Sequence, residues 1–310
     1  MTIWETLLPG SKARRSLPTA GGPDLPLWLV RGGEEGPTLA VTAGVHGCEY
    51  AGIQAVRRLY ESVEPGALRG RLLLIPLANP GGFYTGARQL VPDCGRNLNR
   101  AFPGDPSGDA AARIAAAIRQ TVYPQADLLL DLHSGDIHER LTPLLFYPRA
   151  GSEEVNRRSL AAARVMPLPI RVGSVSKNGL YSCAVQHGVP ALLLEAGDGG
   201  DCREEAVSLL LEGIRAAMGF LGILGAAAEN PCQRESLETV YVQAEQAGFW
   251  QPLVRAGEPF CKGQLLGVLT SLEGEPLQRV EAPFHGLMLY HTRILGVSRG
   301  EELAAFGRLA

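Results

Sequence analysis

Three side chains in this sequence have the types and spacing of a zinc ligand set. His46 and Glu49 lie three residues apart in HGCE, where an apolar run passes through a turn into a helical stretch, so both can face one point. His133 directly follows the apolar run LLLDL. Two imidazoles and one carboxylate leave a fourth tetrahedral position for water, as a catalytic zinc site requires. The His-x-x-Glu spacing alone is a weak signal, and a solvated helix start is the alternative interpretation.

Two further carboxylates could support this site. Asp131 precedes His133 by two residues, so on a strand both side chains point the same way, and Asp131 can hold the second ring nitrogen of His133. Glu195 ends the apolar run ALLLE, where a carboxylate is costly unless it is used or paired. It is therefore the candidate base that takes a proton from water. The alternatives are a buried, hydrogen-bonded Asp131 and a Glu195 that emerges into solvent.

The elements that must position these residues alternate between strands and helices. Apolar and β-branched runs predict buried strands over residues 37–45, 71–77, 126–132 and 191–195. Longer stretches predict helices over residues 50–60, 109–122 and 204–224. The alternation predicts an α/β fold with helices on both faces of the sheet and an active site at the carboxyl ends of the strands.

The pattern changes near residue 235, after the polar stretch AENPCQRES. We therefore expect a main domain over residues 1–235 and a small all-β module over residues 236–310, where short alternating segments are separated by Gly and Pro turns. The stretches GEPFCKGQLLGVL and EAPFHGLMLY resemble a biotinyl/lipoyl-like barrel-sandwich, without a lysine at the tip position where a carrier domain is modified. The module is expected to be structural, shielding the active site or an oligomer interface.

Composition limits the compartment and the partners. The net charge of -3 and the scattered arginines give no basic surface for nucleic acid. The N-terminal MTIWETLLPGSKARR lacks the pattern of a signal peptide, and no apolar run has the length of a membrane span. The six cysteines form no CxxC pair and are expected to be free thiols. We expect a cytoplasmic protein without nucleic-acid or membrane partners. The sequence does not decide between a monomer and a homo-oligomer.

Four motifs together resemble a known enzyme family. HGCE, NLNRAFPG, DLHSG and LLLEAG occur in the order and spacing of the aspartoacylase and succinylglutamate desuccinylase family, a branch of the zinc carboxypeptidase fold. The resemblance spans about residues 35–230 and implies a zinc carboxypeptidase-like mixed sheet. By this resemblance, His46, Glu49 and His133 hold one zinc ion. Glu195 matches the general base and later proton donor.

The resemblance also implies a set of substrate contacts. Asn99 and Arg100, in LNRAF, match the pair that binds a substrate carboxylate, a role that suits an amide beside a guanidinium; a loop pair capping backbone is the alternative. Arg88 matches the arginine that polarises the scissile carbonyl, and Arg96 competes for that role. Tyr181 stands where the family places a substrate-contacting tyrosine, and a packed aromatic is the alternative.

The residue four positions after Tyr181 indicates which amino-acid side chain the substrate carries. Members selective for aspartate carry an arginine there, whereas this chain has Val185. We expect a zinc-dependent amidohydrolase that cleaves a small N-acylated amino acid whose side chain is neutral or basic. The rivals are a metallocarboxypeptidase or peptide amidase of the same fold, and a non-catalytic binding module.

Overall fold

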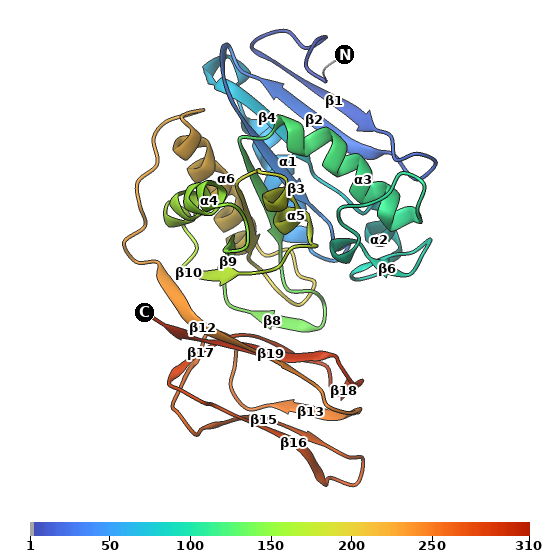
Figure 1. The fold of residues 1–310 in the computed structure, drawn as a ribbon, viewed down its shortest axis with the longest axis vertical. Helices are drawn as coiled ribbons and strands as arrows, with labels where there is room; N and C mark the ends of the chain where they lie inside the picture. The colour runs from blue at the N-terminus through green and yellow to red at the C-terminus, as the bar shows by residue number, and fades with distance from the viewer. Residues whose placement is uncertain (1–2) are drawn as a thin grey trace.

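The computed structural model describes residues 3–310 and is organised around one mixed sheet of 13 strands (Figure 1). Its first strands, in spatial order, are β1 (Ser11–Leu17), β2 (Leu25–Arg31), β4 (Arg69–Ile75), β3 (Glu34–Ala43), β7 (Leu128–His133), β11 (Ala191–Glu195), β9 (Leu144–Pro148) and β10 (Ile170–Ser174). The four central strands β4, β3, β7 and β11 are parallel. Strands β5 (Leu90–Val91) and β6 (Arg96–Asn97) form a separate pair.

Helices cover both faces of the central strands, as predicted (Figure 1). Leu128, Leu130 and Leu132 of β7 pack with α1 and α6 in one apolar cluster, while Leu129 packs with α3 and α5 in the other. A strand buried on both sides has to be apolar at successive positions, which explains the run LLLDL. The α-helices are α1 (Tyr50–Ser62), α2 (Pro80–Thr85), α3 (Ala110–Val122), α4 (Glu153–Arg164), α5 (Leu180–Gln186) and α6 (Glu204–Leu221), and the 3-10 turns are η1 (Pro65–Ala67), η2 (Leu98–Arg100) and η3 (Tyr123–Gln125).

The predicted strands and helices are confirmed with small shifts at their ends. The third helix begins at Ala110 because the side chain of Asp109 accepts a hydrogen bond from the Ala112 N–H at 2.9 Å and caps it. The last helix ends at Leu221, before the predicted residue 224, because Gly222 takes the left-handed conformation with φ of 69° and closes the final turn.

The chain from residue 234 onward is all-β, as predicted, and forms two sheets (Figure 1). One continues the main sheet with β12 (Arg234–Gln243), β19 (Glu302–Leu309), β17 (Gly286–Thr292) and β14 (Pro259–Phe260), and β8 (Glu139–Leu141) pairs with β17. The other contains β16 (Pro276–Glu281), β15 (Leu265–Thr270), β13 (Gly248–Pro252) and β18 (Gly296–Val297). These strands enclose a core of their own around Trp250, Leu266 and Phe306. The likeness to a barrel-sandwich stays a prediction.

The two parts of the chain share hydrogen bonds at the expected boundary. Strand β12 begins at Arg234 and pairs with β10 on one side and with β19 on the other. Arg171 of β10 and Glu235 of β12 form an ion pair at 2.9 Å. Because the sheet is continuous there, the division near residue 235 stays a prediction. Within residues 3–310, no helix combines the length and apolar character that crossing a membrane requires.

Candidate metal centre

A short loop between β3 and α1 presents the first two candidate ligands, His46 and Glu49. The loop packs tightly against α2. A Cβ on Gly47 would lie 2.2 Å from the carbonyl carbon of Gly82, so only glycine fits at position 47. The N–H of Gly47 also donates to the carbonyl of Arg88 at 2.9 Å. These contacts with α2 and with the Arg88 carbonyl fix the backbone of the loop. The side chains of His46 and Glu49 can therefore converge on one point.

Two neighbouring parallel strands present His133 and Glu195. These residues are register partners at the last position of β7 and β11. Since the carboxyl ends of parallel strands meet at one edge of a sheet, both side chains join the β3 loop there. The expected position of the site, at the carboxyl ends of the strands, is confirmed.

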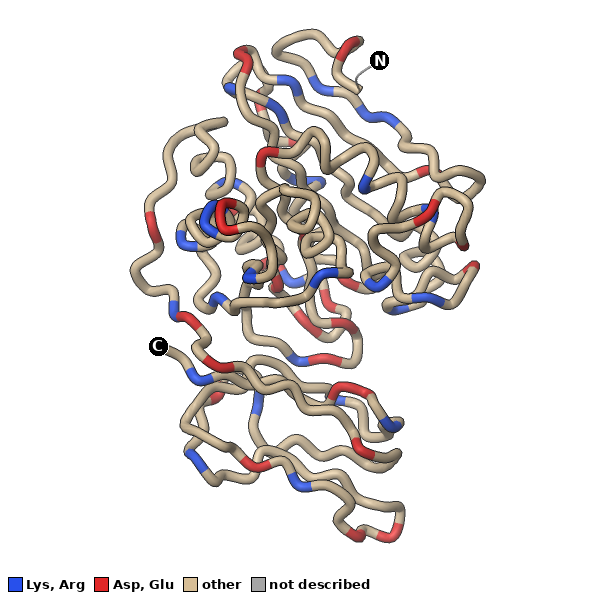
Figure 2. The backbone as a smooth tube through the Cα atoms, in the orientation of Figure 1, with Lys and Arg blue, Asp and Glu red and all other residues tan. Residues whose placement is uncertain are grey.

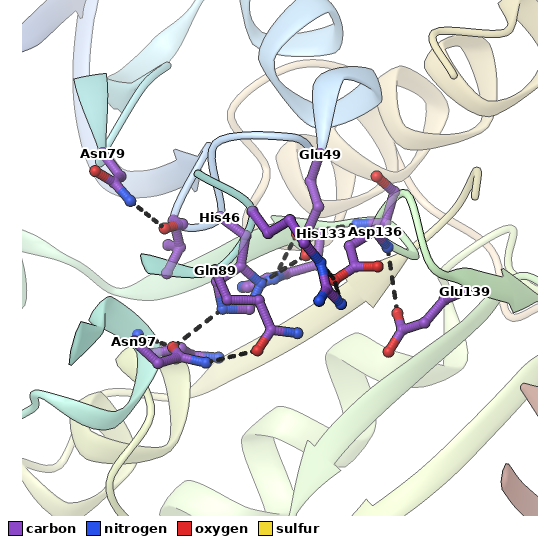
Figure 3. Close-up of polar contacts among 12 residues, drawn as sticks. His46, Glu49, Asn79, Gln89, Asn97, His133, Asp136 and Glu139 are labelled. Carbon is purple, nitrogen blue, oxygen red and sulfur yellow. Dashed lines mark hydrogen bonds and ion pairs between the residues drawn. The ribbon is translucent and has the colours of Figure 1, made fainter. Parts of the chain in front are cut away.

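Glu49 bridges the two histidines in the centre of the site (Figure 3). Its Oε1 lies 2.6 Å from Nδ1 of His46, and its Oε2 lies 2.8 Å from Nδ1 of His133. One ligand atom from each of the three residues lies within 4.8 Å of the others, and all three residues are buried. Among residues 3–310, no other group of three His, Cys, Asp or Glu side chains converges in this way.

The second ring nitrogen of each histidine faces an acceptor. His133 Nε2 lies 3.2 Å from the carboxylate of Asp131, whose other oxygen accepts from the Thr42 hydroxyl at 2.8 Å. His46 Nε2 lies 3.2 Å from Oδ1 of Asn97. A proton held on each Nε2 leaves the Nδ1 lone pairs free as ligands, which is the form a zinc site needs. Nε2 of His133 and Oδ2 of Asp131 are close enough for an ion pair, but their orientation is not that of a hydrogen bond. The role of Asp131 therefore stays a prediction, and Asn97 was not predicted.

Replacing Asp131 with asparagine is expected to weaken zinc binding by about 10- to 100-fold, because the amide can donate to Nε2 and favour the wrong tautomer of His133. Zinc affinity is measured by competition with a chromogenic chelator. Asp127→Asn, at the opposite end of β7, is the matched control, since its carboxylate accepts from the Thr38 N–H far from the histidines. Equal zinc affinities of the two variants would contradict the role of Asp131.

The surroundings of the two central glutamates, Glu49 and Glu195, shift their pKa values in opposite directions. Burial favours the neutral form of Glu49, but the adjacent His46 and His133 outweigh it and lower its pKa to about 2. Burial raises the pKa of Glu195 well above its ordinary value, and the negative Glu49 and Glu139 add to this effect while His133 opposes it. Among the described residues, Oε2 of Glu195 has no hydrogen-bond partner. Glu49 is thus an anionic candidate ligand, and Glu195 is a carboxyl group suited to accept a proton.

Cys48, between the two ligands of the loop, does not belong to this group. Its side chain is buried, and burial, followed by the charges of Glu49 and Asp136, raises the pKa of its thiol to about 12. Its sulfur is not among the ligand atoms that converge in the group of His46, Glu49 and His133.

A cavity of about 470 Å³ opens from the candidate metal centre. Asn99, Arg100 and Tyr181, the predicted substrate contacts, all line it. Oδ1 of Asn99 accepts from the Leu180 N–H at 2.8 Å, which leaves its amide N–H groups without a partner among the described residues. The alternative of a loop pair that caps backbone is met in part, because Oδ1 of Asn99 binds the Leu180 N–H and Nη1 of Arg100 donates to the Asn99 carbonyl at 3.3 Å. Arg100 is exposed and forms no ion pair with any residue of the 3–310 range.

The two candidate arginines for the carbonyl lie outside the cavity lining. Arg88 donates from Nε and Nη2 to the buried Asp136 at 2.9 and 2.5 Å. Arg96 forms an ion pair with Asp109 at 2.6 Å on the surface. The structure brings neither guanidinium to the cavity wall, so the choice between them stays a prediction. Val185 is also absent from the lining.

Several cavity residues were not predicted from the sequence. Tyr241, Gln243, Tyr290 and Glu302 reach the cavity from strands β12, β17 and β19, far along the chain from the four motifs. Glu139 lines it from β8. Only the sheet that joins β8 to the C-terminal strands brings them to the site, so their sequence neighbourhoods carry no signal of this role.

The fold and the site define the class of this protein: an α/β protein with a buried His-Glu-His group and a further buried glutamate, Glu195, at the carboxyl edge of its sheet. The chain belongs to the succinylglutamate desuccinylase/aspartoacylase family, whose catalytic-domain model matches residues 35–221. This confirms the predicted family. The enzymes of this family are hydrolases that act on amides, and so is this protein.

Similar proteins extend the comparison to nearly the whole chain. An N-alpha-acetyl-L-2,4-diaminobutyric acid deacetylase of Halomonas elongata is 28% identical over 92% of this chain and 86% of its own. A succinylglutamate desuccinylase of Pseudomonas paraeruginosa is 32% identical over 44% of this chain and 46% of its own. The product-bound structure of the ectoine utilization protein EutE (DoeB) of Ruegeria pomeroyi has a TM-score of 0.85, with 25% identity and 97% of both chains covered.

Proposed function

We propose that this protein is a zinc-dependent deacylase that hydrolyses the amide bond of a small N-acylated amino acid. The single observation that carries the proposal is the buried group of His46, Glu49 and His133 with Glu195 beside it, at the mouth of a cavity that Asn99 and Arg100 also line. The similar deacetylase and desuccinylase support it, since both names describe removal of an acyl group from an amino acid.

The donor set suits zinc, and a bound zinc ion would supply Lewis acidity, lowering the pKa of water toward neutrality and polarising the amide carbonyl. Glu195 is the group that accepts the proton of the attacking water, because its free carboxyl oxygen is buried beside His133. Once the carbon–nitrogen bond breaks, the same carboxyl group gives this proton to the departing amine. The acyl group leaves as a carboxylic acid.

Positioning of the substrate falls to the remaining polar groups. The free amide N–H groups of Asn99 and the guanidinium of Arg100 are donors for the substrate carboxylate. Arg88 uses Nε and Nη2 to bind Asp136 and lies outside the cavity lining, so its proposed contact with the developing oxyanion requires its Nη1 to turn toward the bound substrate. Tyr181, buried on α5 at the cavity wall, limits the space beside the carboxylate site.

The cavity favours a small substrate over a peptide. Strands β12, β17 and β19 lie across it and contribute lining residues, so the space beside the candidate metal centre is bounded by the C-terminal part of the chain. A metallocarboxypeptidase has to admit a chain of several residues along the same path. The bounded cavity therefore supports a deacylase of small substrates and counts against a peptide-cleaving enzyme.

The test is amine release from a matrix of substrates, with and without a zinc chelator. Acetyl, succinyl and formyl groups are crossed with acidic, neutral and basic amino acids, and short peptides are included. Chelator-sensitive cleavage of an N-acyl amino acid supports the proposal. Cleavage confined to peptides would move the assignment to a carboxypeptidase, and inactivity of zinc-loaded protein on every amide would favour a binding module.

Arg100→Gln is expected to lower kcat/KM for an N-acyl amino acid by about 10- to 100-fold, mainly through KM, because it removes a charge-assisted contact to the substrate carboxylate. Steady-state kinetics of the purified variant measure the effect. The matched variant Arg96→Gln removes a guanidinium from the same loop but outside the cavity. An unchanged KM in Arg100→Gln would contradict its contact with the carboxylate, and a large loss of kcat in Arg96→Gln would favour Arg96 over Arg88 as the arginine at the scissile carbonyl.

A further inference from the structure

Gln89 lines the cavity directly after Arg88, and the proposed reaction assigns it no role. Its backbone is held on both sides. The carbonyl of Arg88 accepts from the Gly47 N–H at 2.9 Å, and the carbonyl of Leu90 accepts from the buried side chain of Asn79 at 3.0 Å. Gln89 is therefore fixed against the loop between β3 and α1 that carries two of the candidate ligands.

The side-chain amide of Asn97 sets the orientation of the side-chain amide of Gln89 (Figure 3). Oδ1 of Asn97 accepts from the Asn99 N–H at 2.8 Å and lies 3.2 Å from Nε2 of His46. Because a backbone N–H can only donate, the atom of Asn97 that faces it has to be the oxygen. Nδ2 of Asn97 then points the other way and donates to Oε1 of Gln89 at 3.0 Å. Both amides are thereby fixed in one orientation.

The amide nitrogen of Gln89 is consequently free to bind a ligand. Since Oε1 is bound to Asn97, Nε2 lies on the opposite side of the amide group, and it has no hydrogen bond with any residue of the 3–310 range. Figure 3 shows Gln89 beside His46, with its amide oxygen toward Asn97 and its amide nitrogen turned away from it. Gln89 thus presents two N–H donors to the cavity and is separated from His46 by Asn97 alone.

The cavity has few positive groups that could stabilise a developing oxyanion. Figure 2 shows acidic positions gathered between the helix-covered part of the chain and the C-terminal strands. Among the described residues of the lining, Arg100 is the only Lys or Arg, and in the proposed reaction it binds the substrate carboxylate. Arg88 is bound to Asp136 outside the lining. An oxygen that becomes negative beside the candidate metal centre therefore needs a further donor from the protein.

We propose that Gln89 donates a hydrogen bond from Nε2 to the oxygen of the scissile acyl carbonyl and keeps this bond as the oxygen becomes negative. This inference rests on the proposed function. An amide whose own oxygen is already bound is a preorganised donor, and it needs no rearrangement when the charge develops. Gln89 faces the cavity already, whereas Arg88 has to turn its Nη1 toward the substrate.

The test replaces Gln89 in two ways that separate donation from a structural role. Gln89→Glu keeps an oxygen that accepts from Asn97 but removes the N–H donors, and Gln89→Met removes both. Each zinc-loaded variant is expected to lower kcat for the preferred N-acyl amino acid by about 10²- to 10³-fold and to keep KM within about threefold. The matched control is Gln243→Glu, which adds a carboxylate to the same cavity from β12 and is expected to keep kcat within about threefold.

Binding gives a second readout that does not depend on turnover. The probe is the N-methylphosphonyl derivative of the same amino acid, in which a tetrahedral phosphorus carries a charged oxygen in place of the carbonyl. Both Gln89 variants are expected to bind this probe about 100-fold more weakly, while the free amino acid product binds within about threefold of its original affinity. Competition with a chromogenic chelator is expected to show unchanged zinc affinity in Gln89→Glu.

Three outcomes would overturn the inference. If Gln89→Met loses kcat and Gln89→Glu retains it, Gln89 acts through Asn97 and not as a donor. If the affinities for the phosphonyl probe and for the free amino acid fall equally, the residue affects binding as a whole. If Gln243→Glu loses as much as Gln89→Glu while Gln89→Met keeps its rate, the loss reflects added charge. A zinc-loaded unmodified protein that cleaves no N-acyl amino acid contradicts the proposed function itself.

Discussion

Glu195→Gln is expected to lower kcat by about 10³- to 10⁴-fold while zinc stays bound. Glutamine keeps the size of the side chain but cannot accept a proton from water or return it to the amine. The ligands lie on other residues, His46 and Glu49 in the β3 loop and His133 at the end of β7, so their geometry does not depend on the carboxyl group of Glu195. Single-turnover kinetics and metal analysis of the same sample measure both effects.

The control for this prediction has to remove a carboxyl group from the cavity without removing the base. Glu139→Gln meets this requirement, because Glu139 lines the same cavity from β8 but is not a register partner of His133. We expect this variant to keep kcat within about tenfold for a neutral substrate, since the amide oxygen of glutamine can still accept from the Asp136 N–H and Glu195 is unchanged. If Glu195→Gln retained near-normal kcat, the water would need another base, and Glu139 is the carboxyl group to examine next.

The residues at the strand ends could be predicted because short-range patterns specify them. His133 and Glu195 each close an apolar run, and a continuous apolar run between predicted helices indicates a strand of a parallel sheet that is buried on both faces. Asp131 follows from the alternation of side chains on a strand. Each of these inferences used the pattern of a single strand, together with the rule that the carboxyl ends of parallel strands meet at one edge of the sheet.

The remaining site residues depend on pairings between distant segments. Glu302 reaches the cavity because β19 pairs with both β12 and β17, and Tyr290 because β17 pairs with β8, some 150 positions earlier in the chain. No local pattern specifies these pairings, and an exposed glutamate at the first position of a strand is indistinguishable in the sequence from a solvated one. Asn97 was missed for a different reason. Its importance lies in one side-chain contact to His46, which residue spacing does not reveal.

Removal of the metal is expected to abolish activity and to leave the chain folded. Glu49 lies 2.6 Å from His46 and 2.8 Å from His133, so these histidines can pair with the buried carboxylate once the metal is removed. The strands that carry the site are packed on both faces by the two apolar clusters, which do not involve the ligands. Dialysis against a chelator, followed by circular dichroism and an activity assay, tests both parts of this expectation.

Adding metal back to the chelated protein distinguishes a catalytic role of zinc from a purely stabilising one. Zinc is expected to return full activity and to raise the free energy of unfolding by about 3 kcal/mol when its free concentration is 100 times Kd. Magnesium is expected to return none, because two imidazole nitrogens suit zinc, whereas magnesium prefers oxygen ligands in octahedral geometry. His133→Ala, which removes one ligand, should reproduce the inactive chelated state and resist rescue by zinc. Undiminished turnover in the chelated protein would exclude the metal from the reaction and leave His46, Glu49 and His133 as a buried ionic cluster.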